Sequence, residues 1–484
     1  MRKVIPCFYG SYGKYLVKLR SIPSYDDGLI PATRRILLSL HDVAKEKLTK
    51  SNVIVGHAMG SYHPHGDLSI YSTLQKLVLH GFASSEQSNW GSRSLHGADE
   101  PAAMRYTETK LEKWVEDLAF KYYKYSDWDN IEHEDEPLFL PCPVPVGLIG
   151  YDVITGIAFH RVSCPRYTIK DLLTRLKWLL DNGPIKEYDI EKIDEENIQS
   201  TLGPEIKPNF RDCISKPTEK DSYYRILTNG EGSLKIIPNG GIGQDKSIYI
   251  KGQVPGSSFK RLKKLCDPNN KNRKFNADLI DLCGTDGNFY SIIIQVVPTK
   301  KNQDLKSLFK EIWSECLISN INFECYFSDD EGKVLKQGID DIIIRNYNNW
   351  VKCVFRKRAA DFDKINKEKF NLHIIDVIRK AVNDNGKSIT SISNIINYFQ
   401  NQYINKLVEL EKFDLESSEF KKFKIEIDEK NIERVCKEKS ISKLIEIDVD
   451  FVEIDKKISD VKNHVKNTKK DCYDYVVELL SKES

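Results

Sequence analysis

The fold is decided by one stretch, PATRRILLSLHDVAKEKLTKSNVIVGHAMGSYHPHGDLSIYSTLQKLVL, which runs from Pro31 to Leu79. Its first part, Pro31–Leu48, opens with a proline suited to a first helical turn and repeats apolar residues at helical spacing. We predict a second short helix over Asn52–Tyr62 and a third over Gly66–Leu79. Two helices joined by a turn, with a basic and hydroxyl-rich start, can place one helix in the major groove of DNA.

Beyond Pro137 the sequence changes to β-branched runs separated by Gly and Pro turns, which are typical of strands. A helix is predicted among them at Asp304–Cys316, so this region indicates an α+β domain. The predicted strands are Tyr223–Thr228, Leu234–Pro238, Lys246–Val254, Tyr290–Val297 and Ile321–Phe327.

The segment Ile339–Val382 contains neither Pro nor Gly, so we predict one very long helix. Within it, Ile343, Tyr347 and Trp350 recur with the spacing of a seam between two helices. A second stretch, Phe451–Leu480, is long enough to pack back along the first. The residues between these two stretches are predicted to form a small helical head.

Composition excludes several classes of protein. The 484 residues include 73 Lys or Arg and 71 Asp or Glu, for a net charge of +2 and a mean hydropathy of -0.46. No apolar run is long enough to cross a bilayer or to form a signal peptide, so we expect a multi-domain protein of the cytoplasm. The 11 cysteines form no CxxC pair, which argues against a zinc module and a disulfide framework and indicates free thiols.

An arginine directly precedes a tyrosine in PAAMRYTETK, Pro101–Lys110. A tyrosine has a pKa of about 10, so its hydroxyl is a weak nucleophile at neutral pH. The forked guanidinium of Arg105 suits a phosphate, and it would help Tyr106 only if the target were a phosphodiester. Taken alone, the pair is more typical of an exposed tyrosine beside a solvated arginine.

Two histidines separated by one residue, His63 and His65, precede the third predicted helix. On an extended segment they can face the same side, so they could bind a metal, orient a phosphate or cap the helix. Upstream, Arg20, Arg34 and Arg35 offer guanidinium donors suited to phosphate, although single arginines are more often solvated.

Four motifs occur in one order: DGLIPATRRIL from Asp27, GSYHPHGDLSIYSTLQKLV from Gly60, NWGS from Asn89 and AAMRYTETKL from Ala102. Together they resemble the breakage-reunion subunit of type IIA DNA topoisomerases, which is the A subunit of gyrase and topoisomerase IV and the equivalent phage subunit. The close resemblance covers about residues 10 to 170, and beyond it only the order of elements agrees. The compact architecture is most similar to the phage subunits.

The resemblance implies an α+β multi-domain fold. A winged-helix domain carrying the tyrosine would comprise residues 1–140, and an α+β tower domain residues 141–337. A long antiparallel coiled-coil stalk would comprise residues 338–382 and 451–484, and a helical dimerisation head residues 383–450. Two copies would form a homodimer with gates at both ends.

The resemblance also implies roles for single residues. Tyr106 would attack a backbone phosphorus, forming a 5′-phosphotyrosine and releasing a 3′-hydroxyl. Arg105 and Arg20 would stabilise the charge of the transition state. His65, with His63 as the second candidate, would hydrogen-bond the phosphate or the nucleophile. The implied DNA-binding residues are Arg34, Arg35, Ser61 and Ser69.

Two departures from the family pattern bear on DNA binding. Ile30 and Thr33 stand where bacterial relatives usually carry Lys and His. In the segment Gly156–Ile169, Ser163 or Cys164 takes the place of an isoleucine that the family inserts between bases. DNA bending would then use another wedge or none.

The sequence contains no P-loop and no acidic motif of the kind that binds magnesium in this family. The resemblance therefore implies that a separate B-type subunit binds ATP and Mg²⁺, with no metal held by this chain. The two subunits would form a heterotetramer on double-stranded DNA and act as an ATP-dependent type II DNA topoisomerase. The chain stops soon after the second long helix, which favours relaxation and decatenation over the introduction of negative supercoils.

Two other classes remain open. A relaxase-type endonuclease also combines a His-x-His pair with a tyrosine, but it cleaves one strand and usually has a hydrophobic residue between the histidines, where this chain has Pro64. A non-enzymatic DNA-binding protein would need no tyrosine at position 106. The order of the four motifs favours the topoisomerase subunit over both.

Overall fold

The computed structural model describes residues 13, 22–131, 134–157, 161–185, 188, 198–255, 259–286, 290–300, 304–329, 331–384, 391–402 and 407–483. The chain mixes helices and sheets, which confirms the α+β prediction. Its internal contacts divide it into two compact units, residues 1–350 with 476–484 and residues 351–475. Among the described helices, none has both the length and the apolar content that a membrane crossing requires.

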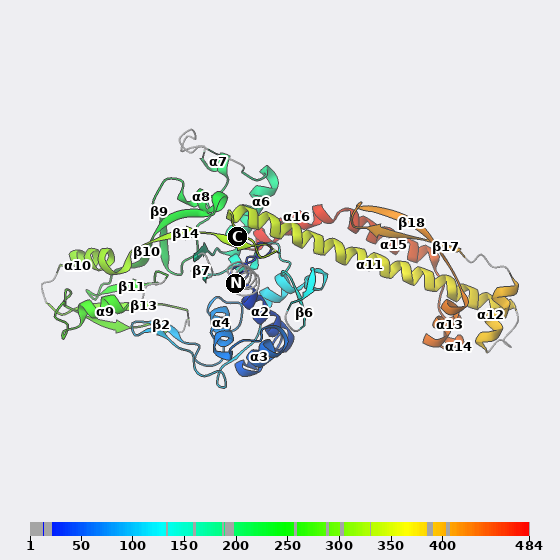
Figure 1. Ribbon diagram of the computed structural model, residues 1–484, viewed down its shortest axis with the longest axis horizontal. Coiled ribbons are helices and arrows are strands. Elements are labelled where there is room, and N and C mark those ends of the chain that lie inside the picture. Colours follow the sequence, from blue (N-terminus) through cyan, green and yellow to red (C-terminus); the bar gives the residue numbers. More distant parts are fainter. Residues whose placement is uncertain are drawn as a thin grey trace, which may run out of the picture. The chain divides into compact units, whose positions relative to one another are not determined.

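Three helices form the part of the first unit that carries the family motifs (Figure 1). They are α2 (Pro31–Val43), α3 (Ser51–His57), which continues into a π-helical turn (Ala58–Tyr62), and α4 (Asp67–Leu79). All three were predicted, although α2 ends before the predicted Leu48 because Lys45, Glu46 and Lys47 have no buried face to extend the helix. The three helices pack against one another, and they contribute these fully buried side chains: Ile36, Leu37, Ile54, Leu74 and Val78.

Short strands and turns connect these helices to the rest of the unit. The hairpin β2–β3 follows α4, and β4 pairs antiparallel with β1. A second hairpin, β5–β6, precedes the sheet. The bounds are β1 Thr49–Lys50, β2 Ser92–Ser94, β3 Gly97–Asp99, β4 Glu108–Thr109, α5 Lys113–Val115, a π-helical turn Glu116–Phe120, β5 Trp128–Asn130 and β6 Asp135–Pro137.

An eight-stranded sheet forms the other part of the first unit. Its strands follow the order β12-β13-β11-β10-β14-β8-β7, with β9 also paired to β10. Helices α9 and α10 pack on it, and their buried residues join those of β11 and β13 in one core that includes Ile250, Ile294 and Trp313 (Figure 1). The bounds are β7 Val153–Ile157, β8 Arg161–Pro165, β9 Cys213–Pro217, β10 Glu231–Ile242, β11 Ile248–Lys251, α9 Lys260–Cys266, β12 Ala277–Asp281, β13 Ile293–Pro298, α10 Leu305–Ile312 and β14 Ser319–Glu324.

One predicted strand of this region is wrong, because Tyr223–Thr228 lies in a helix, α8 (Ser222–Asn229). Its aromatic and β-branched residues suggested a strand, but Tyr223, Tyr224, Ile226 and Leu227 are all buried, as on one face of a helix. Gly230 ends the helix with a φ of 73°, a conformation that favours glycine. The other predicted strands are confirmed in β10, β11, β13 and β14.

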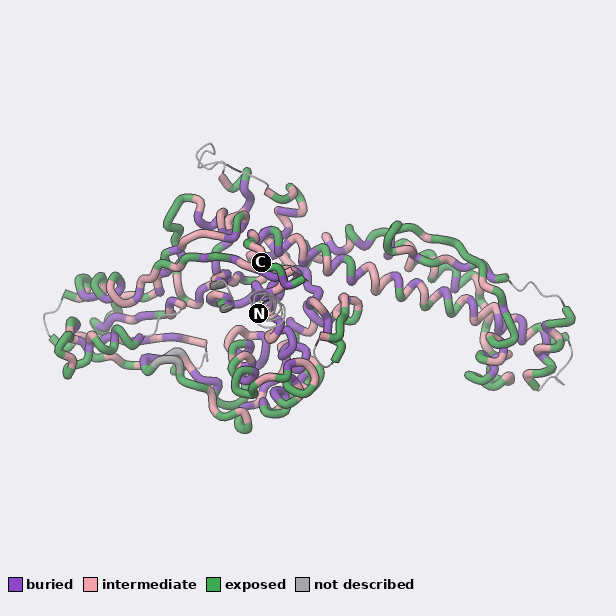
Figure 2. The backbone as a smooth tube through the Cα atoms, viewed as in Figure 1, coloured by how far each residue is buried: buried purple, intermediate pink, exposed green. Residues whose placement is uncertain are grey.

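The very long helix is confirmed as α11 (Ile339–Asp384), which has 46 residues. Its first turn is tied to α6 (Ile169–Asn182) by a buried ion pair, in which Arg175 Nη2 lies 2.6 Å from Asp340 Oδ2. Figure 2 shows buried residues alternating with exposed ones along α11, as expected for a helix that packs along one side. Further elements of the first unit are α7 Ile198–Leu202, β15 Tyr326–Ser328 and β16 Val334–Lys336.

The second unit contains a β-hairpin that the sequence did not predict. Strands β17 (Leu407–Asp414) and β18 (Glu419–Glu426) pair antiparallel within the segment expected to be a helical head. Phe413 and Phe420 of the hairpin pack with Phe362 of α11 and Val465. The head is therefore mixed, with helices α12 Ile392–Asn401, α13 Glu429–Glu438 and α14 Ile441–Ile445.

The second long stretch contacts α11 and forms two helices rather than one. These are α15 (Phe451–Lys466) and α16 (Thr468–Lys482), with Asn467 between them. Lys369 Nζ of α11 lies 2.8 Å from Asp455 Oδ1 of α15, and Arg358 Nη1 lies 2.7 Å from Asp471 Oδ2 of α16. The cysteines of the described residues are all free thiols, as the sequence indicated.

Candidate active site and DNA-facing groove

The Arg105–Tyr106 pair lies on the loop between β3 and β4 and points to solvent. The side chain of Tyr106 is 60% exposed, which is unusual for a large aromatic residue. The guanidinium carbon of Arg105 lies 4.7 Å from the centroid of the Tyr106 ring. A tyrosine ring and a permanent cation therefore lie together on the surface of the chain.

Hydroxyl groups beneath this loop fix its two ends. Tyr71 of α4 donates from its hydroxyl to the carbonyl of Ala102 at 2.5 Å, and the same hydroxyl lies 2.9 Å from Oγ1 of Thr107. Thr107, which is fully buried, donates in turn to Oγ of Ser51 at 2.8 Å. The exposed pair is thus carried by a loop whose flanking residues are held in the core.

Backbone hydrogen bonds hold the same loop. The amide of Asn52 donates to the carbonyl of Met104 at 3.2 Å, and the amide of Ser51 donates to the carbonyl of Thr107 at 2.9 Å. On the other side, the amide of Ala102 donates to the carbonyl of Asn89 at 2.9 Å. The loop that carries Tyr106 therefore contacts both the start of α3 and the NWGS motif.

His63 and His65 lie next to each other at the start of α4. His63 is buried, and the two ring centroids are 4.3 Å apart at an interplanar angle of 72°. Nη1 of Arg35 lies 3.2 Å from Nδ1 of His63. Because a guanidinium can only donate, Nδ1 of His63 accepts this bond, and a neutral ring carries its proton on Nε2.

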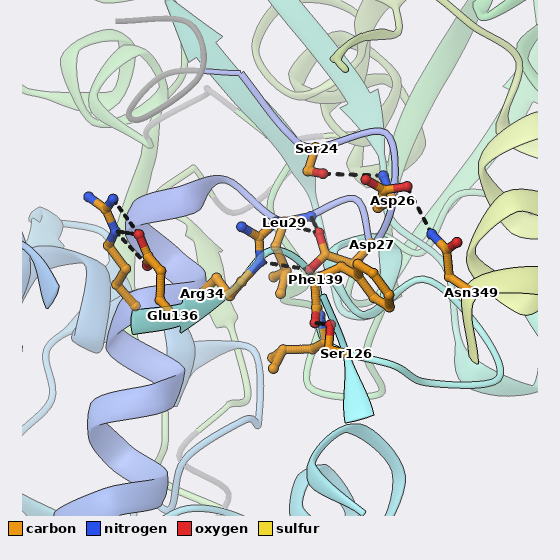
Figure 3. Close-up of polar contacts among 11 residues, drawn as sticks. Ser24, Asp26, Asp27, Leu29, Arg34, Ser126, Glu136, Phe139 and Asn349 are labelled. Atoms are coloured by element: carbon orange, nitrogen blue, oxygen red, sulfur yellow. Dashed lines mark hydrogen bonds and ion pairs between the residues drawn. The ribbon is translucent and has the colours of Figure 1, made fainter. Parts of the chain in front are cut away.

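Arg34 and Arg35 are buried and paired with carboxylates. Arg35 donates to both oxygens of Glu136, with Nη2 to Oε1 at 2.7 Å, and Nε of Arg34 lies 2.8 Å from Oδ2 of Asp27 (Figure 3). Burial alone would lower the pKa of Arg34, but the Asp27 carboxylate outweighs it and raises that pKa. Both arginines therefore have carboxylate partners within the chain. The sequence suggested that they contact DNA phosphates directly, but in this structure both side chains are buried.

The loop before α2 contacts several elements of the first unit. Asp27 also accepts from the amides of Leu29 and Leu140, at 3.0 Å each. The neighbouring Asp26 accepts from Nδ2 of Asn349 at 2.8 Å (Figure 3). It also accepts from Nε of Arg345 at 2.6 Å. These bonds fix the start of α2 relative to the first residues of α11.

A groove of about 640 Å³ lies beside the exposed face of α4. Ser69, Thr73 and Lys76 of α4 line one side, and Thr155 of β7 lines another. The groove also includes Ile30 and Thr33, the two positions at which the sequence departs from bacterial relatives. The lining of this groove therefore combines polar groups and two cations, Lys76 and Arg166, with apolar side chains such as Leu77 and Phe82.

The remaining expected site residues have different positions. Ser69 is exposed on α4, whereas Ser61 is half-buried in the π-helical turn. Cys164 is fully buried in β8, and burial raises the pKa of its thiol well above the usual value, so it is not available as a wedge between bases. Ser163 is half-buried opposite Thr155. Arg20 lies outside the described residues.

Three residues that contact the site were not identified from the sequence: Glu136, Tyr71 and Ser88. Glu136 lies in an acidic run, and its signal was a carboxylate placed directly before the apolar segment that starts at Pro137. Tyr71 and Ser88 carried no recognisable signal. Among the described residues, no group of three or more His, Cys, Asp or Glu side chains is arranged to hold a metal.

Comparison with known proteins agrees with this geometry. The family model for the A subunit of DNA gyrase/topoisomerase IV matches residues 20–453. The chain is 31% identical over 238 residues to the DNA gyrase A subunit of Borrelia hermsii, covering 47% of this chain and 27% of that protein. It is 27% identical over 430 residues to the DNA topoisomerase 4 A subunit of Staphylococcus aureus, covering 85% of this chain and 50% of that protein.

These matches, together with the exposed tyrosine and the helices beside it, define the class as A-type subunits of type IIA topoisomerases. The chain belongs to the family of DNA gyrase and topoisomerase IV A subunits. The resemblance carried by the four motifs is thereby confirmed. The chain spans at most half the length of these relatives.

Proposed function

We propose that this chain is the DNA cleavage and religation subunit of an ATP-dependent type IIA topoisomerase. The observation that carries the proposal is the exposed Tyr106, which lies against Arg105 on a loop fixed at both ends. A tyrosine that is merely structural would bury its ring, whereas a nucleophile must reach a phosphorus outside the chain.

In the proposed reaction, Oη of Tyr106 attacks a backbone phosphorus of DNA. A phosphorus–oxygen bond forms to the tyrosine, the bond to the 3′-oxygen breaks, and the tyrosine proton is transferred away as the 3′-hydroxyl gains one. Reversal of the same step reseals the strand. Because the phosphotyrosine conserves the bond, resealing needs no external energy, and two copies in a homodimer would cut both strands for relaxation or decatenation.

The neighbouring residues have supporting roles in this proposal. Arg105, and Arg20 by resemblance, would stabilise negative charge on the phosphorus centre. His65 would hydrogen-bond the phosphate or the nucleophile, and His63 would hold His65 through their ring contact at 4.3 Å. Arg35 and Arg34 would act indirectly, because Arg35 contacts His63 and both arginines are paired with carboxylates.

Double-stranded DNA is the proposed substrate. The exposed face of α4, with Ser69, Thr73 and Lys76, would enter the major groove as in a winged-helix domain, and β2–β3 would be its wing. Helix α9 adds a row of exposed cations that suits the phosphate backbone. These cations are Lys260, Arg261, Lys263 and Lys264.

Partners complete the proposed enzyme. By resemblance, ATP and Mg²⁺ are bound by a B-type subunit, and two copies of each subunit form a heterotetramer on DNA in the cytoplasm of a bacterium or an infected host cell. The magnesium would supply Lewis-acid stabilisation of the phosphate when bound. The second unit would provide the stalk and the dimerisation head.

The test is the substitution Tyr106→Phe in the chain assembled with its B-type partner and supercoiled plasmid. Denaturation during turnover should trap double-strand breaks with protein on the 5′ ends for the wild type and none for Tyr106→Phe, with DNA binding unchanged. Tyr249→Phe, which alters another solvent-reachable hydroxyl on the sheet, is the control and should cleave normally. Adducts from Tyr106→Phe would refute the assignment, and nicks in only one strand would favour the relaxase.

A further inference from the structure

Ser88 has a backbone conformation that serine rarely adopts. Its φ is 79°, in the left-handed region that favours glycine. The same segment contains Gly81 with a φ of 77°, where an added side chain would meet nothing within 4 Å. At Gly81 the left-handed conformation is thus met by glycine. At position 88 the same conformation is adopted by a residue with a side chain.

The side chain of Ser88 has a specific contact. Its hydroxyl donates to the backbone carbonyl of Tyr106 at 2.5 Å, across 18 positions of sequence. The adjacent residues contact the same loop, because Gln87 forms a β-bridge with Glu108 and the carbonyl of Asn89 accepts from the amide of Ala102. The segment around Ser88 therefore lies along the whole loop that carries the tyrosine.

The segment that carries Ser88 is itself fixed to the core. Trp90 is fully buried, donates from its indole nitrogen to the carbonyl of Gln87 at 2.9 Å, and accepts from Nε2 of Gln75 of α4 at 3.0 Å. Ser88 is thus an exposed residue on a rigid support. Residues held in sparsely populated backbone regions by such a support are concentrated at functional sites.

The contact at the carbonyl matters because the side chain of Tyr106 is held by little else. The ring is 60% exposed, and its one ring contact in the described part of the chain is with Arg105, which is itself exposed. The direction of the Cα–Cβ bond, and hence the reach of the hydroxyl, depends on the orientation of the Tyr106 backbone. The bond from Ser88 fixes the carbonyl end of that residue, and the bond from the Tyr106 amide to the carbonyl of Ala103 at 2.8 Å fixes the other end.

We infer that Ser88 is a positioning residue for the nucleophile, one that sets the aim of Tyr106 through its backbone carbonyl. This inference rests on the proposed function, because it requires Tyr106 to be the attacking group. Since water can reach both the hydroxyl and the carbonyl, the bond adds little to stability. Its effect should appear in the geometry of attack, where a displacement of about 1 Å can slow a reaction on the order of a hundred-fold.

Two substitutions separate positioning from backbone strain. Ser88→Gly removes the hydroxyl and relieves the strain, so the thermal midpoint should stay level or rise. Ser88→Ala removes the hydroxyl and keeps the strain, so the midpoint should stay level or fall. In the assembled enzyme, both variants should cleave DNA about ten- to a hundred-fold more slowly in a single turnover, with DNA affinity unchanged.

The matched control is Ser418→Gly, which relieves the same kind of strain at a φ of 56° in the turn between β17 and β18. It should cleave as the wild type does. Wild-type cleavage by Ser88→Gly, or cleavage rates that follow the thermal midpoints, would overturn the inference and leave Ser88 a structural residue. Tyr106→Phe in the same assay distinguishes the two failures, because adducts from that variant would overturn the proposed function itself.

Discussion

Arg35 shows at the scale of one residue how burial decides what a charged side chain does. Its side chain is 1% exposed, and Glu136, which lies 101 positions away in the sequence, accepts three of its hydrogen bonds. Its guanidinium also contacts Nδ1 of His63. A buried ion pair adds little net stability, but loss of one partner leaves a buried charge uncompensated.

The first prediction follows for Glu136. Glu136→Ala leaves the guanidinium of Arg35 in the core without its carboxylate, so the free energy of unfolding should fall by about 3–5 kcal/mol. Glu136→Gln keeps the shape and one acceptor and should cost less. Urea unfolding measures both, with Glu134→Ala, an exposed neighbour, as the control within about 0.5 kcal/mol of wild type. A cost for Glu136→Ala no larger than that of the control would show that Arg35 does not depend on this carboxylate.

At this scale the sequence predicted the candidate nucleophile better than its surroundings. The adjacency of Arg105 and Tyr106 is local, so the motif alone was enough to predict that they lie together. The burial of Arg34 and Arg35 was not predictable, because it depends on carboxylates that only the fold brings near. The role of Ser88 was not predictable either, because the residues around it in the sequence indicate neither its positive φ nor its contact with Tyr106.

Among the elements, the hairpin β2–β3 is hydrogen-bonded to one carboxylate of the sheet, that of Asp281. Leu95, in the turn of this hairpin, is buried in the core that α9 and α10 form on the sheet. Its amide donates to Oδ2 of Asp281 at 2.9 Å, and the amide of Cys283 donates to Oδ1 at 3.1 Å. Burial alone would raise the pKa of Asp281, but these amide donors outweigh it and lower the pKa below the usual value.

The second prediction is a pH dependence with a definite sign. Because the folded-state pKa of Asp281 is depressed, its contribution to stability is complete above the ordinary Asp pKa of about 3.9 and is lost as pH falls through the lower folded value. Asp281→Asn should therefore lower the unfolding midpoint at pH 5–7, and the difference from wild type should shrink in acid below about pH 4. Asp278→Asn, exposed on the same strand, is the control. A difference that stays constant down to pH 3 would contradict the assignment.

Elements were predictable where their pattern was long and one-sided. Helix α11 followed from 44 consecutive residues without Pro or Gly, and it extends only two residues beyond the prediction, to Asp384. Helix α8 was misread because aromatic and β-branched residues favour strands on average, while here their spacing buries one helical face. The hairpin β17–β18 was missed because its charged residues dominate the composition. Its few apolar side chains find their partners only in the fold, on α11, on α15 and on the helices α12, α13 and α14.

For the whole molecule, the family model can be compared with the division into two units. The family model matches residues 20–453, which include most of each unit, so both units belong to the region that this family shares. The chain nevertheless aligns with at most half the length of its curated relatives. By resemblance, we expect a complete catalytic cycle to need the ATP and Mg²⁺ functions of a B-type subunit.

The last prediction concerns that assembly. The purified chain should bind duplex DNA with an affinity that falls as salt rises, because cations such as those of α9 displace counterions from phosphates. It should not relax a supercoiled plasmid, since by resemblance ATP and Mg²⁺ are bound by the B-type subunit. Adding that subunit with both cofactors should restore relaxation, and omitting either cofactor should abolish it.

The Tyr106→Phe chain is the matched control, because it should bind DNA and the partner yet give no relaxation. Relaxation by the purified wild-type chain without another protein would contradict the proposed division of labour, and the number of strands cut would then decide between a self-sufficient topoisomerase and a relaxase.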